Sequence, residues 1–177
     1  MATAVHILVE EYLRSSYEPD CDYVDGELQE RNLGEQYHSL VQKMVAVIFS
    51  VTRKQWGLRS LTEQRVQVSA RRYRIPDVCV VRSSDPIEPI LHTPPVLCVE
   101  VLSPEDRFAR IQQRVQEYQQ MGVQHIWVID PETREIWTAA GQEGLRPFTG
   151  NALPVPGVSA AISVADIFAE IDEAPRS

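Results

Sequence analysis

Two apolar segments that each contain a single acid constrain the fold of this chain more than any other feature. They run from Ile75 to Val81 (IPDVCVV) and from Val96 to Leu102 (VLCVEVL), and both are almost continuous in branched or small apolar residues. Such segments are typical of β-strands covered on both faces, because a half-exposed strand alternates apolar and polar residues. The sequence therefore predicts two central strands of a sheet with a covering layer on each side.

The other segments predict a mixed α/β protein. The expected order is helix, hairpin, helix, three strands, helix and two strands, with a helix packed on each side of a central sheet. Helices are expected at 6–15, 35–55, 103–121 and 163–171, strands at 65–68, 75–81, 96–102, 125–130 and 135–139, and a hairpin turn at Asp25-Gly26. A length of 177 residues suggests a single domain over 1–177, with a core at about 10–140 and a C-terminal extension at 141–177.

The third helix has a predicted start and a predicted end. Ser103 suits the N-cap, Pro104 the first helical position, and Glu105 and Asp106 the positive end of the helix dipole. Gly122 is expected to end the helix. On this interpretation the two acids after Ser103 are explained by capping alone.

Composition narrows the class of protein. Hydrophobic residues make up 44%, enough for a packed core, and the net charge of −8 argues against a protein that coats nucleic acid. A carboxylate site with a local basic patch is compatible with this charge. The three cysteines have no C-x-x-C spacing, which argues against a zinc ribbon and a disulfide framework. No secretory signal or apolar span is seen, and a cytoplasmic location is expected.

The acids inside the two apolar segments are the candidate site. Asp77 interrupts the first segment, and Glu100 interrupts the second on the same strand face as Cys98 and Leu102. Burying an unpaired carboxylate costs on the order of several kcal/mol. Two such acids on consecutive core strands therefore favour the interpretation that they function as a pair. Two carboxylates on neighbouring strands suit a Mg²⁺ or Mn²⁺ ion, which in turn can orient a scissile phosphate. The alternative is that both acids face solvent at strand ends, or that one pairs with an arginine.

Several motifs together resemble a known family. They are YVDGELQER, YHSLVQKM, YRIPDVCVV, PPVLCVEVLSPEDR and EYQQMGVQHIWVIDPETREI, which cover about residues 10–140. As a set they resemble the Uma-type putative restriction endonucleases of the PD-(D/E)XK superfamily. The resemblance implies a restriction-endonuclease-like core, divalent-metal dependence, and Asp77 and Glu100 as the motif acids. It also suggests Glu27 as an extra acid near the site and His38 as an accessory residue.

The chain departs from the superfamily pattern at the basic residue. The motif places a lysine two residues after the second acid, where this chain has Leu102. Relatives supply the lysine from the following helix, four residues before a tyrosine, and the matching residue here is Arg114. Arginine stays protonated and cannot act as a base, but it can neutralise a phosphate.

Other arginines have two open interpretations each. Arg107, Arg110 and Arg114 form a stripe beside the apolar face of their helix, which is either a phosphate-binding flank or a solvated one. The arginines before Asp77 are either a basic rim or ordinary turn residues: Arg71, Arg72 and Arg74.

Three functions compete at this point. The first is a metal-dependent endonuclease-like phosphodiesterase that acts on DNA through Asp77 and Glu100, with Arg114 acting electrostatically. The second is a catalytically weak or inactive nuclease-like module that binds nucleic acid or a protein partner. The third is a structural or regulatory protein that keeps the acids as remnants. A homodimer is expected only by analogy with nucleases that cut both strands.

Overall fold

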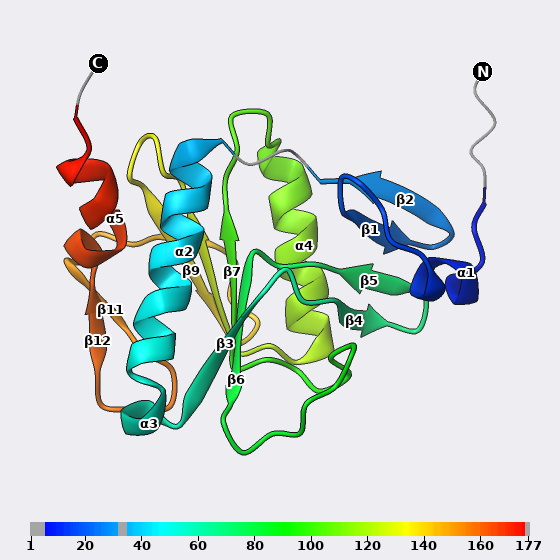
Figure 1. Ribbon diagram of the computed structural model, residues 1–177, viewed down its shortest axis with the longest axis horizontal. Coiled ribbons are helices and arrows are strands. Elements are labelled where there is room, and N and C mark those ends of the chain that lie inside the picture. Colours follow the sequence, from blue (N-terminus) through cyan, green and yellow to red (C-terminus); the bar gives the residue numbers. More distant parts are fainter. Residues whose placement is uncertain (1–5, 32–34, 176–177) are drawn as a thin grey trace.

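A central mixed sheet lies between two helical layers, which confirms the predicted mixed α/β class (Figure 1). The computed structural model describes residues 6–31 and 35–175. Its largest sheet has six strands in the order β10(Arg146–Pro147), β9(Ile136–Ala140), β8(His125–Ile129), β7(Leu97–Val101), β6(Val78–Arg82), β3(Leu58–Thr62). Strands β7 and β8 run parallel, and the other neighbours are antiparallel.

Each face of the two central strands is buried, as their apolar sequence predicts. Helices α2(Gln36–Val51) and α5(Val164–Glu173) pack on one face, against a cluster that includes Val80 and Val99. Helix α4(Phe108–Met121) packs on the other face, where Cys79 and Cys98 are buried. Because Val78 pairs with Val99, one further step in the same register puts Asp77 opposite Glu100.

A second, smaller sheet lies beyond α4 (Figure 1). Its order is β2(Glu27–Glu30), β1(Cys21–Val24), β5(Arg72–Arg74), β4(Val66–Ser69). Asp25 and Gly26 both have positive φ between β1 and β2, so the predicted hairpin turn is confirmed. Helix α1(Val9–Arg14) covers this sheet through stacked tyrosines. A short hairpin, β11(Ala152–Pro154) and β12(Ala161–Ser163), precedes α5.

The predicted start of α4 is wrong. The helix begins at Phe108 with Arg107 at the N-cap, five residues later than expected, while its end at Gly122 is confirmed. The Ser103 amide donates to the Asp106 carboxylate at 2.7 Å, and the Asp106 amide donates back to the Ser103 carbonyl at 2.9 Å. This side chain-to-backbone bond stabilises a turn in place of the first helical turn. Asp106 thus belongs to a turn that lines the pocket described below and does not cap a helix.

The helix expected at 35–55 is two helices. It divides into α2 and α3(Arg53–Trp56) at Thr52, whose hydroxyl donates to the Ile48 carbonyl at 2.6 Å. Such a bond to the carbonyl four residues earlier weakens the helical ladder locally. Strands β3, β5, β10, β11 and β12 were not predicted, because they are short or rich in polar residues. Within the described ranges, no helix is long and apolar enough to cross a membrane.

Burial of His125 at the start of β8 predicts a pH dependence of stability. Burial lowers the pKa of this imidazole below its usual value of 6.5. As the pH falls through 6.5, the unfolded chain therefore binds a proton that the folded protein binds less tightly, and the free energy of unfolding decreases. In urea denaturation at about pH 7 and about pH 5.5, His125→Gln should lose less stability than the wild type. An equal loss in both proteins would contradict the prediction.

Candidate active site

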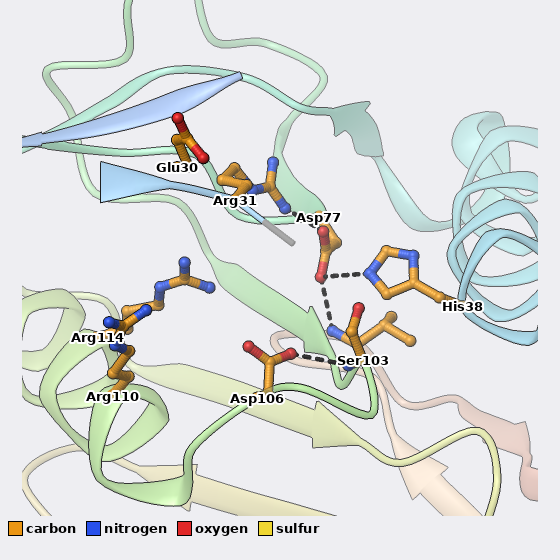
Figure 2. Close-up of a pocket in the computed structure, with 9 residues that line it drawn as sticks. Glu30, Arg31, His38, Asp77, Ser103, Asp106, Arg110 and Arg114 are labelled. Atoms are coloured by element: carbon orange, nitrogen blue, oxygen red, sulfur yellow. Dashed lines mark hydrogen bonds and ion pairs between the residues drawn. The ribbon is translucent and has the colours of Figure 1, made fainter. Parts of the chain in front are cut away.

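A polar pocket opens beside Asp77, where the second sheet, the central sheet and two helices meet (Figure 2). In Figure 2, His38 approaches Asp77 from α2, and Arg110 and Arg114 lie on α4 at the other side. The lining residues are Glu30, Arg31, His38, Asp77, Val101, Ser103, Asp106, Arg110 and Arg114. The pocket thus combines three carboxylates with three guanidinium groups and an imidazole.

The Asp77 carboxylate is buried and holds three donors. Its Oδ2 accepts from the Val101 amide at 2.7 Å and lies 3.4 Å from His38 Nε2, while Oδ1 contacts the Arg31 guanidinium. Burial raises the pKa of Asp77, but the His38 hydrogen bond and the Arg31 charge outweigh this and leave the pKa below its usual value. Asp77 is therefore ionised at neutral pH, with its charge already compensated.

Glu100 lies behind the pocket and does not line it. This carboxylate is 1% exposed; Oε1 accepts from the Tyr118 hydroxyl and Oε2 from Arg114 Nη1 at 2.9 Å. Burial and the charge of Asp77 raise the pKa of Glu100, although Arg114 lowers it. Because Arg114 both lines the pocket and contacts Glu100, the guanidinium and not the carboxylate faces the opening.

A buried network of acids and arginines fixes Arg114 from behind. Arg114 Nη2 lies 3.2 Å from Asp22 Oδ2, and the same oxygen accepts from Arg74 Nη1 at 2.9 Å. Arg74 is 2% exposed and also donates to Glu117 on α4. Buried charges persist only when they are paired in this way. The network therefore ties α4 to the second sheet and holds the Arg114 fork in one orientation.

The structure brings most of the predicted site residues together. Asp77, His38 and Arg114 meet at the pocket, and Glu100 lies next to it across the strand pair. Glu27 is different: it is exposed at the first residue of β2, beside the hairpin turn and outside the pocket lining. Glu30, at the other end of β2, lines the pocket in its place.

The arginines expected near the site divide into separate groups. Arg110 lines the pocket with Arg114, whereas Arg107 caps the helix and does not line it. Arg74 is neither a basic rim nor a turn residue, because it is buried in ion pairs within β5. The predicted arginine flank of α4 therefore contributes two residues to the pocket.

Four residues of the site and its supporting network were not predicted from the sequence. Asp22 is buried in the apolar strand β1, and this is the same signal that identified Glu100 in its strand. Tyr118 is buried among the apolar residues of α4, but its hydroxyl donates to Glu100, a contact that no sequence pattern indicates. Arg31 and Asp106 lie outside helices and strands, and no periodicity marks them.

The donor chemistry of Asp77 and Glu100 fits a divalent cation. They are carboxylates on opposite positions of two strands, and hard oxygen ligands suit Mg²⁺ or Mn²⁺. All four carboxylate oxygens already accept from or contact protein donors, however. Among the described residues there is no cluster of three or more His, Cys, Asp or Glu able to hold a metal. An ion held by this pair would need at least one of the two arginine contacts to give way and water or substrate to complete its coordination.

The buried network predicts a strong effect of Arg74 on stability. Arg74→Met should lower the free energy of unfolding by about 3 kcal/mol, because it removes two buried ion pairs and leaves Asp22 with Arg114, and Glu117 with Arg72, as the remaining cationic partners. Lys43→Met, which removes an exposed ion pair with Glu170, is the control and should cost about 0–1 kcal/mol. Urea denaturation measures both. Similar losses for the two variants would show that the Arg74 pairs do not stabilise the fold.

Comparisons with known proteins identify the family. The model of the Uma2 family, described as putative restriction endonuclease, matches residues 9–156. A putative nuclease belonging to DUF820 from Anabaena variabilis has a crystal structure that aligns with a TM-score of 0.80 and 24% sequence identity, over 92% of this chain and 98% of that chain. This likeness shows the fold. A comparison with curated proteins gave no match. Since the family model spans most of the chain, the chain belongs to the Uma2 family of putative restriction endonucleases.

Proposed function

We propose that this protein is a divalent-metal-dependent nuclease that hydrolyses phosphodiester bonds in DNA. The observation that carries the proposal is the pair Asp77 and Glu100, which face each other across the two central strands beside a pocket lined by three arginines. Membership of a restriction endonuclease family supports the same class of reaction. A nuclease needs carboxylates for a cation and positive groups for the phosphate, and this site offers both.

Asp77 and Glu100 are the residues that would hold Mg²⁺ or Mn²⁺. When bound, such an ion polarises the phosphate and lowers the pKa of a bound water. Tyr118 orients the Glu100 carboxylate through its hydroxyl, and the Val101 amide and His38 orient the Asp77 carboxylate. These contacts come from α4, β7 and α2, so the two acids are fixed by the packed core of the fold.

Arg110 and Arg114 are placed to bind the substrate phosphate. Both line the pocket, and a guanidinium can donate two parallel hydrogen bonds to phosphate oxygens. None of the residues that line the pocket is a lysine, and arginine does not lose its proton near neutral pH. Arg114 therefore stabilises negative charge in the transition state and does not abstract a proton.

Plasmid nicking tests the catalytic proposal. The wild type, incubated with supercoiled plasmid and Mn²⁺ or Mg²⁺, should convert it to open circles, and Glu100→Gln should nick at least about 100-fold more slowly. Glutamine has nearly the same shape, so an unchanged melting temperature would show that the variant is folded. Equal nicking by both proteins would point to a contaminant or to a different site.

Arg114→Lys is the matched variant for the basic position. It restores the residue type that the family resemblance implies at this position, and it should keep or raise the nicking rate of the wild type. Loss of nicking in Arg114→Lys would indicate that the arginine fork, and not only its charge, is needed for the phosphate.

Both acids form ion pairs with arginines inside the protein, and this favours a second candidate function, binding without cleavage. Asp77 and Glu100 are each neutralised within the protein, and the net charge is −8, so a module that binds without cutting is consistent with the site. Absence of nicking by the wild type with either ion would select this alternative. A homodimer would suit cleavage of both strands, and the mass of the protein in solution tests it.

A further inference from the structure

The Arg31 guanidinium contacts the carboxylate at which the proposed ion would bind. Arg31 follows the last residue of β2, lines the pocket and contacts Asp77 Oδ1 (Figure 2). Its side chain is 13% exposed, so the contact is shielded from water. Burial lowers the pKa of Arg31, but Asp77, Glu100 and Asp22 together raise it, and the group stays charged.

Each of the two proposed metal-binding carboxylates already has a guanidinium partner before any ion binds. Asp77 contacts Arg31 and Glu100 contacts Arg114, so two carboxylates face two guanidinium groups. A divalent ion between the carboxylates would add two positive charges next to both arginines. Repulsion between charges a few ångströms apart is strong where water is largely excluded. An ion therefore binds well only if at least one guanidinium moves away.

Of the two arginines, Arg31 is the one less firmly held. Among the described residues, the Arg31 side chain bonds to one carboxylate, whereas Arg114 bonds to both Glu100 and Asp22. The Arg31 backbone is anchored separately, because its amide donates to the Asp20 carbonyl at 3.1 Å. The long side chain can thus turn into the pocket while the strand end stays in place.

We propose that Arg31 exchanges partners during binding: it neutralises Asp77 in the ion-free protein and moves to a phosphate of the nucleic acid when a divalent ion takes over that carboxylate. This inference rests on the proposed function and deepens it, since it assigns Arg31 to the phosphate. A guanidinium released from a carboxylate finds an equivalent bidentate acceptor in a phosphodiester. The ion and the phosphodiester consequently bind cooperatively, and each raises the affinity for the other by the same factor.

Mn²⁺ titrations followed by the melting temperature test the exchange, because an ion that binds only the folded state raises that temperature by mass action. Dimethyl phosphate, the smallest phosphodiester of this type, serves as the second ligand. In the wild type, the diester should lower the apparent dissociation constant for Mn²⁺ by about tenfold. If the diester leaves the apparent dissociation constant of the wild type for Mn²⁺ unchanged, that result alone overturns the proposed exchange.

Variants then assign the effect to Arg31. Arg31→Gln should bind Mn²⁺ about tenfold more tightly than the wild type without the diester, and the diester should add little further affinity. Arg110→Gln is the matched comparison: it removes another pocket arginine that has no ion pair with Asp77, so its affinity for Mn²⁺ alone should rise much less than that of Arg31→Gln. Equal Mn²⁺ affinity in Arg31→Gln and the wild type would overturn the proposal.

The outcomes separate this inference from the function on which it rests. Plasmid nicking that depends on Glu100, together with Mn²⁺ affinity that does not depend on Arg31, overturns the exchange and leaves the nuclease intact. Absence of Mn²⁺ binding by either protein, even with the diester, overturns the exchange and the metal site together.

Discussion

Burial of carboxylates around α4, where it meets the central sheet and the second sheet, is the constraint on which the rest of the structure depends. Glu100, Asp22 and Glu117 are all at most 4% exposed, and each requires a positive partner in the same place. Arg114 and Arg74 supply the charge, from α4 and from the second sheet. The short strands of the second sheet therefore have a structural role. They bring Asp22 and Arg74 against a helix that the main sheet positions from its other side.

This network gives a physical reason for arginine at position 114. Its guanidinium spans Glu100 and Asp22 with two different nitrogens, at 2.9 and 3.2 Å. A planar fork with several donors can bridge two carboxylates in this way, whereas a lysine ammonium is a compact point charge. The arginine at position 114 therefore matches its surroundings, because it contacts Asp22. Asp22 is itself held by hydrogen bonds from Arg74 and from the Ile75 amide. Arginine at this position bridges two buried carboxylates and, unlike lysine, cannot act as a base.

The parts of the site predicted from sequence are those carried by strong local patterns. Acids inside apolar strands identify Asp77 and Glu100, and the family resemblance suggests His38 and Arg114, which line the pocket beside them. The missed parts depend on contacts between distant segments. Arg31 meets Asp77 across 46 residues, and Arg74 meets Asp22 across 52. The late start of α4 was missed because Ser103 and Asp106 suit a helix cap and a turn equally well; only the packing of the loop selects the turn.

The proposed function requires an acidic chain to bind a polyanion, and the site offers a local source of positive charge. With a net charge of −8, the whole protein does not attract a polyanion, and long-range steering is weak. Attraction has to arise locally, and the pocket gathers Arg31, Arg110 and Arg114 within one opening. Two of these guanidinium groups, those of Arg31 and Arg114, are paired with Asp77 and Glu100. On the proposed exchange, a cation at Asp77 would release Arg31. Positive charge thus becomes available to a phosphate at the point where an ion is also bound, so a site of this kind favours phosphodiester and metal together over either alone.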